Sequence, residues 1–195
     1  MKKITRTMLC VMIAASLVSS MTLITSNTPI SYADSSNPQD FMNMTEEQRV
    51  ESAKNMTLKE KEMVMNEFSK QNSTVDENMS EPTSSKDTNT LVGNLVGSGD
   101  GFHNAEGVAK VINLADGRTF LRLENLKATN GPDLYVYLST GKDASDIVNL
   151  GRLKGNIGNQ NYEIPAGTDL SKYDTVLIWC KAFSVLFGSA KLAPQ

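Results

Sequence analysis

Residues 90–195 carry the alternating apolar and polar pattern that is typical of β-strands. The run 133–140 (DLYVYLST) alternates with a period of two, and runs at 106–114 and 119–126 flank ADGR, whose Asp-Gly pair is a hairpin signal. Further strand-like runs lie at 161–165, 175–183 and 184–192. Because no long helical pattern interrupts them, we expect an all-β fold, an antiparallel β-sandwich over residues 90–195.

Residues 34–68 have a different pattern, which predicts two short helices with a break near Asn55. Thr45 is followed three residues later by Gln48, so this pair can form a capping box over the free amide groups of a helix N-terminus. Thr57 and Glu60 repeat the same spacing. The second helix carries one apolar stripe, formed by Leu58, Val64, Met65 and Phe68.

Residues 69–89 show no periodicity and contain SEPTSSKDTNT, so we expect a disordered linker between the helices and the sandwich. Methionines cluster in the preceding helical segment, which raises the question of a copper site built on thioethers. The segment has neither histidine nor cysteine, and flexible methionines commonly fill apolar helix faces, so we interpret them as packing residues.

Residues 1–33 are organised as a secretory signal peptide of bacterial type. Lys2, Lys3 and Arg6 precede an apolar run that ends in SYA, and these small residues predict cleavage before Asp34. A retained membrane anchor is the alternative, but serines and threonines interrupt the run and no stop-transfer charges follow. We therefore expect a secreted or extracellular protein, loosely associated with the cell surface and without a membrane span after cleavage.

Charge separates the two segments that remain. Acidic residues outnumber basic ones in residues 34–89, whereas the two balance in residues 90–195. The whole sequence has a net charge of −3, and cleavage of the leader would remove basic residues only. With no basic patch, we expect no binding of nucleic acid.

Cys180 is expected to have no disulfide partner, because the other cysteine, Cys10, lies in the signal peptide. On a strand, Cys180 shares a face with Ile178 and Ala182, while Lys181 points the other way and does not lower the pKa of the thiol. This arrangement favours a buried structural thiol. A lone cysteine in an exported protein favours a reactive thiol or an intermolecular bond instead, and both interpretations stay open.

His103 is the single histidine and lies in the glycine-rich stretch GSGDGFHNAEG. A histidine near Cys180 would lower the pKa of the thiol, or the two would flank a metal or a haem; a loop histidine without such a role is the alternative. One Cys and one His do not fill a four-ligand zinc site, so no metal site is expected. Gly97, Gly99 and Gly101 precede a strand rather than a helix, which excludes a phosphate loop.

Four segments in this order, GDGFHNAEG, NGPDLYVYL, LGRLKGNIGNQNYEIP and VLIWCKAFSVLFGSAKL, resemble the DM-thirteen domain family, which is proposed to act in electron transfer. The resemblance spans residues 91–192 and implies an extracellular β-domain, joined in some relatives to DOMON modules that bind haem or sugars. It implies that Cys180 is a redox thiol or a ligand to a prosthetic group such as haem. The histidine of the opening motif corresponds to His103, and the Gly-Pro-Asp motif to residues 131–133.

These observations predict a redox or electron-transfer domain that acts through Cys180, with His103 as candidate partner, haem as candidate cofactor and an extracellular redox or surface protein as partner. The alternative is a non-catalytic extracellular binding or adhesion module for a protein or carbohydrate ligand. Enzymatic activity stays open. No Ser-His-Asp arrangement or carboxylate pair supports hydrolysis, so an activity would be redox. We expect a monomer.

Overall fold

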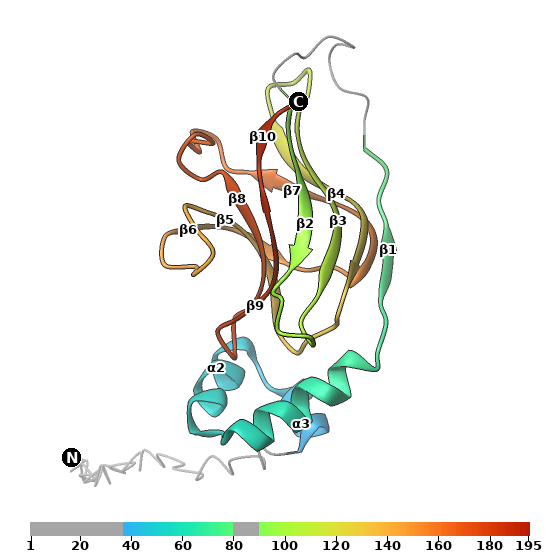
Figure 1. Cartoon of the computed structure of the whole chain (residues 1–195), viewed down its shortest axis with the longest axis vertical. Coiled ribbons are helices and arrows are strands. Elements are labelled where there is room, and N and C mark those ends of the chain that lie inside the picture. Colours follow the sequence, from blue (N-terminus) through green and yellow to red (C-terminus); the bar gives the residue numbers. More distant parts are fainter. Residues whose placement is uncertain (1–36, 80–89) are drawn as a thin grey trace, which may run out of the picture. The chain divides into compact units, whose positions relative to one another are not determined.

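The computed structural model describes residues 37–79 and 90–195. The signal peptide expected at residues 1–33 and the part of the expected linker at 80–89 lie outside the described residues. The described residues form mostly strands, with helices confined to the segment before residue 70 (Figure 1). No helix in residues 37–79 or 90–195 has both the length and the hydrophobicity needed to cross a bilayer.

Along the chain, the helices come first and the strands follow. The helices are α1 (Pro38–Asn43), α2 (Glu46–Asn55) and α3 (Leu58–Ser69). The strands are β1 (Thr74–Asp76), β2 (Leu91–Gly97), β3 (Ala105–Asn113), β4 (Thr119–Ala128), β5 (Leu134–Ser139), β6 (Ile147–Arg152), β7 (Ile157–Ile164), β8 (Thr175–Cys180), β9 (Val185–Lys191) and β10 (Ala193–Pro194).

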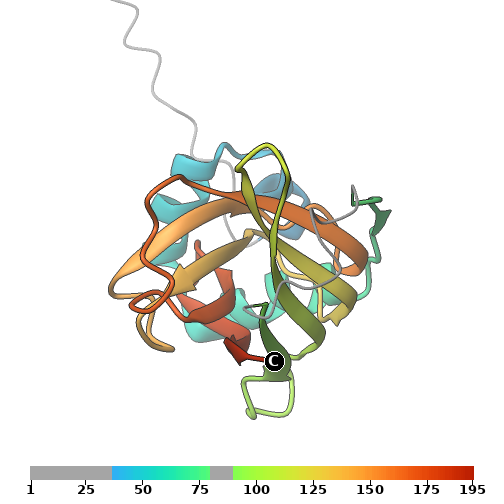
Figure 2. The same cartoon turned by 90° about the horizontal axis from the view of Figure 1, so that it is seen from above.

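The strands form a curled sheet in the order β1-β7-β4-β3-β2-β9-β8-β5-β6, with β10 paired to β2. Strand β2 joins the two halves, because residues 92–95 pair with β3 while residues 96–97 pair with β9. Figure 2 shows the strands wrapping around a common interior. Among the described strands, the pairings are antiparallel except for β1 with β7. The all-β class is confirmed.

The hairpin between β3 and β4 turns at Asp116 and Gly117, as the sequence predicts. Gly117 has a φ of 87°, a left-handed conformation that glycine adopts without steric strain. The carboxylate of Asp116 accepts a hydrogen bond of 3.0 Å from the backbone N–H of Arg118. The N–H of Leu114 donates to the carbonyl of Arg118 at 2.9 Å and closes the turn.

Strand β5 shows how the period-two pattern divides between two apolar environments. Leu134, Val136 and Leu138 point into the main core, while Tyr135 and Tyr137 belong to a smaller cluster on the opposite face. All six residues of the strand are buried. Both faces of the strand are therefore covered.

Within residues 37–79 the structure has three helices where the sequence analysis expected two. The additional helix, α1, begins after Asn37, whose side chain accepts a hydrogen bond of 3.1 Å from the backbone N–H of Gln39. Pro38 occupies its first position, where the missing N–H of proline is not needed. Asparagine followed by proline was thus a start signal in the sequence that the analysis did not use.

Helices α2 and α3 begin at the capping boxes that the spacing predicts. Thr45 and Gln48 exchange both hydrogen bonds at the start of α2, and Thr57 and Glu60 do so at the start of α3. The expected apolar stripe of α3 is wrong in one position. Leu58 is 81% exposed, because it is the first residue of α3 and does not reach the buried core that Val64, Met65 and Phe68 join.

The helices share the main core with the sheet. Phe41 of α1, Val64 and Phe68 of α3 belong to the same buried cluster as the inward side chains of β4, β5 and β8. The ring of Phe41 lies 5.5 Å from the ring of Phe183, which follows β8. The N-terminal segment is therefore packed against the β-domain.

Part of the expected linker is ordered, so the prediction of disorder is wrong for residues 70–79. Strand β1 pairs in parallel with β7, and Thr74 aligns with Ile157. Beyond the strand, the ammonium group of Lys154 lies 2.7 Å from the carboxylate of Glu77. These partners lie far away along the chain, so the local pattern did not reveal them.

Candidate functional site

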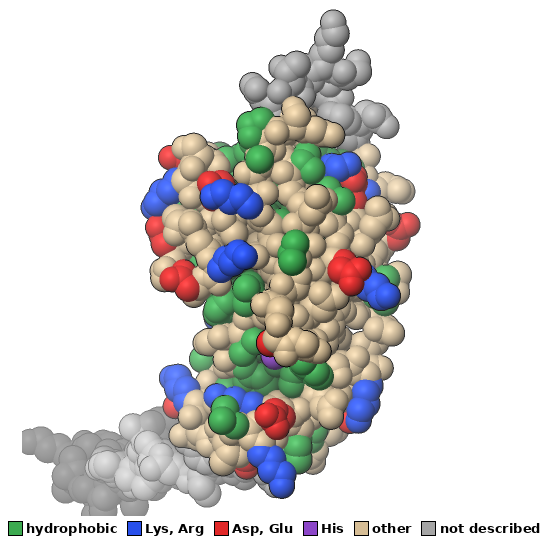
Figure 3. Space-filling view, viewed as in Figure 1, with side chains coloured by type: hydrophobic (Ala, Val, Ile, Leu, Met, Phe, Trp, Pro, Cys, Tyr) green, Lys and Arg blue, Asp and Glu red, His purple; other side chains and the backbone are tan. Residues whose placement is uncertain are grey.

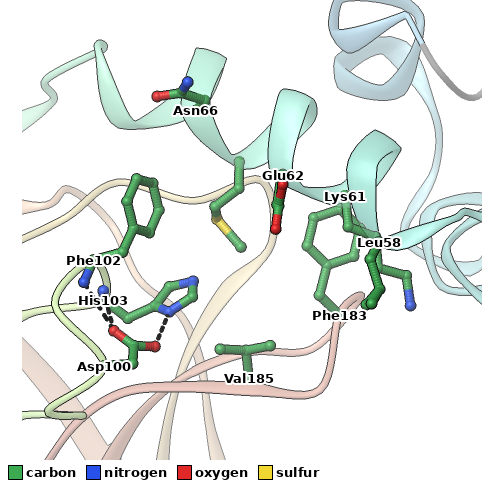
Figure 4. Close-up of a pocket in the computed structure, with 10 residues that line it drawn as sticks. Leu58, Lys61, Glu62, Asn66, Asp100, Phe102, His103, Phe183 and Val185 are labelled. Carbon is green, nitrogen blue, oxygen red and sulfur yellow. Dashed lines mark hydrogen bonds and ion pairs between the residues drawn. The ribbon is translucent and has the colours of Figure 1, made fainter.

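A cavity of about 660 Å³ lies between α3 and the loop that joins β2 to β3. Figure 4 shows the helix on one side, the loop with its histidine on the other, and Val185 of β9 beneath them. In the space-filling view, hydrophobic side chains gather in this hollow (Figure 3). The lining residues are Leu58, Lys61, Glu62, Met65, Asn66, Asp100, Phe102, His103, Phe183 and Val185.

The β2–β3 loop is held in shape by the carboxylate of Asp100. Its Oδ1 atom accepts hydrogen bonds from the backbone N–H groups of Phe102, at 2.9 Å, and His103, at 2.8 Å. Gly99 and Gly101 on either side have φ values of 87° and 85°, which a residue with a Cβ atom rarely adopts. Gly99 and Gly101, which the sequence analysis compared with a phosphate loop, thus allow the backbone to form this turn instead.

The same carboxylate orients the ring of His103. The Oδ2 atom of Asp100 lies 2.5 Å from the Nδ1 atom of His103, so the Nδ1–H group donates to the carboxylate, and in the neutral imidazole the lone pair is then on Nε2. The ring packs edge-on against Phe187, with centroids 4.5 Å apart, and against Phe102 at 5.0 Å. Among the described residues, the buried Nε2 atom has no hydrogen-bond partner.

The pKa of Asp100 reflects these contacts. Burial acts to raise it, but the hydrogen bonds from the His103 ring and from the backbone N–H groups of Phe102 and His103 outweigh burial. The net effect holds the pKa of Asp100 well below its usual range. The carboxylate is therefore ionised at neutral pH and holds the imidazole in one orientation.

Helix α3 supplies the opposite wall of the cavity. Met65 is buried there, and Lys61 lies with its ammonium group 6.0 Å from the centroid of the Phe183 ring. Among the described residues that line the cavity, Lys61 is the one lysine or arginine. The walls thus combine apolar and aromatic side chains with Lys61, the polar side chains of Glu62 and Asn66, and one unpartnered imidazole nitrogen.

Cys180, at the end of β8, does not line this cavity. Its side chain is fully buried, and it forms no disulfide within the described residues. Burial raises the pKa of the thiol to about 12, which outweighs the opposing effect of nearby backbone N–H groups, among them those of Phe183 and Asp133. The structure therefore places the two candidate residues, Cys180 and His103, in different surroundings, and the thiol is protonated at neutral pH.

Asp133 is the residue that the structure places next to Cys180. Leu134 pairs with Cys180 in the β5–β8 ladder, and the N–H of Lys181 donates to the carbonyl of Asp133 at 2.9 Å. The side chain of Asp133 is 0% exposed. Its Oδ1 atom lies 3.2 Å from the guanidinium of Arg49 in α2 and 3.3 Å from that of Arg152.

The cluster formed by Asp133, Arg49 and Arg152 contains polar atoms that lack a hydrogen-bond partner within the part of the chain that the structure describes. Among the described residues, neither the Oδ2 atom of Asp133 nor the Nε atom of Arg49 has a hydrogen-bond partner. Burial raises the pKa of Asp133 in spite of the two guanidinium groups. The sequence analysis reached Asp133 only through the resemblance, and it missed Arg49, because nothing in the pattern of α2 indicated a partner in the sheet.

A second pair of charges lies at the outer edge of the same cluster. The carboxylate of Glu46, in the first turn of α2, accepts hydrogen bonds from the hydroxyl of Tyr135 and from the ammonium group of Lys181. Lys181 thus points away from the face that carries Cys180, as the alternation predicts.

In the part of the chain that the structure describes, no group of three or more His, Cys, Asp or Glu side chains is placed to hold a metal ion.

Comparison with known families gives one match. Residues 98–192 match the family model described as "Electron transfer DM13". The matched range includes Asp100, His103, Asp133 and Cys180, and it begins after α1, α2 and α3. Comparisons with curated proteins and with solved structures gave no match.

Proposed function

We propose, from the match of residues 98–192 to the family model described as "Electron transfer DM13", that the protein is an electron-transfer protein that holds a haem in the cavity through His103. We propose also that the chain is exported, as the signal-peptide pattern of residues 1–33 indicates. Its electron partner would then be an extracellular redox protein or a protein of the cell surface.

One observation carries the proposal: His103 presents an unpartnered Nε2 atom in the cavity while its Nδ1 atom is bound to a carboxylate. A histidine that binds a metal almost always donates its other ring N–H to a carboxylate, a carbonyl or water, which fixes the tautomer and the orientation of the ring. A buried polar atom without a partner requires an explanation, and a bound ligand supplies one.

The aromatic and aliphatic side chains of the remaining walls fit the faces of a flat, mostly apolar group, and Lys61 and Glu62 add one charge of each sign. The cavity volume lies within the range of small-molecule and cofactor sites. Phe102 and Phe183 supply aromatic surface, and Lys61 is placed to pair with a carboxylate such as a haem propionate. When bound, haem supplies one-electron chemistry through its iron, with a potential that its axial ligands and surroundings set.

The chain's own residues have separate roles in this proposal. Asp100 holds the His103 ring in the tautomer whose Nε2 atom is free to bind a metal. Phe187 packs against the ring edge-on and limits its rotation. Met65, which is buried, and the aromatic side chains would give the bound group an apolar contact surface. Cys180 has no part in it, because its thiol is buried and protonated outside the cavity.

The experiment that tests the proposal is a titration of the purified protein with haem, followed by its Soret band. We expect saturable binding with a shifted Soret band, and we expect His103→Ala to weaken the affinity by about tenfold or more. Cys180→Ala is the matched control and should bind haem as the parent protein does. If the parent protein does not bind haem, or if His103→Ala binds it equally well, the proposal is wrong.

The same cavity suggests a second candidate, a non-redox binding module for an apolar or aromatic ligand. Its aromatic and aliphatic side chains would hold the apolar part of such a ligand, and Lys61, Glu62 and Asn66 would orient it. If the purified protein binds an aromatic probe in the cavity but leaves the spectrum of added haem unchanged, the result would support the binding module instead.

A further inference from the structure

The cavity between α3 and the β2–β3 loop has two sides of different origin. Phe102 and His103 lie in the range that matches the family model, whereas Lys61 and Met65 belong to α3, which precedes that range. We propose that the thioether of Met65 is the second axial ligand of the haem, on the face opposite His103. The inference rests on the proposed function, because it concerns the same cofactor, and it assigns a part of the site to the N-terminal helices.

A haem iron bound by one histidine keeps a second axial position, and few side chains of this cavity have a free donor atom for it. On the loop side, the carboxylate of Asp100 is engaged with the His103 ring and with two backbone N–H groups. On the helix side, the polar side chains of Glu62 and Asn66 are exposed. Met65 is 5% exposed, so among the described lining residues of α3 its sulfur is the one buried atom with a lone pair for iron.

Met65 and His103 come from opposite walls of the cavity. Figure 4 shows α3 on one side, carrying Lys61, Glu62 and Asn66, and His103 on the other side in the β2–β3 loop. A flat ring that enters between these walls presents one face to the imidazole and the other face to the helix. One axial position of its iron then faces His103, and the other faces α3.

The packing of α3 holds Met65 in place before any cofactor binds. Val64, which precedes it, is fully buried, and Phe68, three residues later, is 8% exposed. Both belong to the core cluster that the helices share with the sheet. Thr57 caps the start of the helix through its capping box with Glu60. A ligand on an anchored helix loses little conformational freedom on binding, which favours affinity.

The order of side chains along α3 also fits the cofactor. Lys61 and Met65 are four residues apart, so they lie on one face of the helix, one turn from each other. Lys61 is partly exposed, whereas Met65 is buried. This face thus offers a cation toward solvent and a neutral sulfur toward the interior. Haem has the same arrangement when its propionates reach solvent and its iron is buried.

A thioether ligand suits the function proposed for the site. Methionine paired with histidine raises the reduction potential of a haem, and with both axial positions filled no position is open for dioxygen. This ligand set therefore favours electron transfer over oxygen chemistry. The sequence analysis interpreted the methionines of residues 34–68 as packing residues, because that segment has no histidine. The fold supplies one, since His103 of the β2–β3 loop lies across the cavity from α3.

The test compares the haem-loaded parent protein with Met65→Leu and Met63→Leu. Leucine fills nearly the same volume as methionine, so the core stays packed while the sulfur is removed. Met63 is the matched control, because it lies two residues away on α3, is 43% exposed and does not line the cavity. We expect all three proteins to bind haem, since His103 is present in each.

Two measurements report the ligand itself. The first is the near-infrared spectrum of the ferric protein, in which a methionine sulfur bound to haem iron gives a weak charge-transfer band. We expect this band in the parent protein and in Met63→Leu, and its loss in Met65→Leu. The second is the affinity for added imidazole, which should be tighter by about tenfold or more in Met65→Leu than in the parent protein. A filled axial position lowers the apparent affinity in proportion to the fraction of molecules in which it is open.

The outcomes separate this inference from the proposed function. If the parent protein binds no haem, or if His103→Ala binds it equally well, the proposed function fails and this inference fails with it. If the parent protein binds haem through His103 but lacks the charge-transfer band, the inference alone is wrong. It is equally wrong if Met65→Leu keeps the band and the parent affinity for imidazole. Because the band is measured on the parent protein, the result does not depend on the folding of Met65→Leu.

Discussion

The Nδ1 atom of His103 lies 2.5 Å from the Oδ2 atom of Asp100, in a turn that Asp100 itself builds through two backbone hydrogen bonds. The free ring nitrogen of His103 is buried without a partner among the described residues, and the ring lines a cavity. One carboxylate thus determines both the shape of the loop and the orientation of the imidazole.

Asp100→Asn should therefore weaken haem binding while the sheet stays intact. The amide cannot accept the Nδ1–H hydrogen bond as an ionised carboxylate does, and loss of such an outer partner typically reduces affinity by about 10-fold to 100-fold. Haem titration measures the effect. Asp116→Asn is the control, because Asp116 caps the β3–β4 turn in the same way but lies outside the cavity. Equal affinity in Asp100→Asn and Asp116→Asn would show that Asp100 does not position the ring.

The Cys180 thiol should be unreactive in the folded parent protein at neutral pH. It is fully buried, and its pKa is raised to about 12, so almost no thiolate is present. Labelling in native buffer should be slow, and labelling in denaturant should be complete. Cys180→Ala removes one buried sulfur and should lower the free energy of unfolding by about 1 kcal/mol, measured by urea titration. Rapid labelling of the folded protein would contradict this account.

The ion pair between Arg49 and Asp133 should show strong coupling in a double-mutant cycle. Arg49→Met alone leaves the buried Asp133 carboxylate with Arg152 as its guanidinium partner. We therefore expect this variant to lower the free energy of unfolding by about 3 kcal/mol. Asp133→Asn added to Arg49→Met removes the buried charge and should restore part of that loss. Urea unfolding of the four proteins measures the coupling free energy. Additive effects would mean that the two side chains do not interact.

Attachment of α2 should weaken in acid because of Glu46. Its hydrogen bond with Lys181, and then that with Tyr135, lower the pKa of Glu46 below its ordinary 4.5, with a smaller contribution from Arg152. A carboxyl group with a lowered pKa stabilises the attached state above about pH 4.5, and this contribution is lost as the pH falls through the lowered value. Asp133, whose pKa is raised by burial, acts in the opposite direction.

Hydrogen exchange of the α2 amides, corrected for intrinsic rates, measures this dependence. Protection should fall between pH 6 and pH 3 in the parent protein, and Glu46→Gln should show a smaller dependence because the titrating group is gone. An identical pH response in Glu46→Gln would assign the effect to another group.

Short sequence motifs predicted the turns and helix starts that are stabilised by hydrogen bonds between neighbouring residues. The Asp116-Gly117 pair predicted the β3–β4 hairpin, and Thr45 and Thr57 predicted the starts of α2 and α3. In each case the interacting groups lie within three residues of one another. Asn37 carried the same kind of signal for α1.

Interactions between distant parts of the chain could not be predicted from these patterns. Arg49 and Asp133 are 84 residues apart, and β1 owes its order to pairing with β7. The sequence identified His103 as a candidate site residue. The role proposed for it also depends on the cavity wall that α3 provides, which the sequence did not reveal. A pattern specifies which face of a helix is apolar, and it does not specify which surface that face meets.

The haem titration of the parent protein beside His103→Ala tests the central claim most directly. The account predicts saturable binding with a shifted Soret band in the parent protein, and an affinity weaker by about tenfold or more in His103→Ala. Equal binding by the two proteins, or none by the parent, would contradict it.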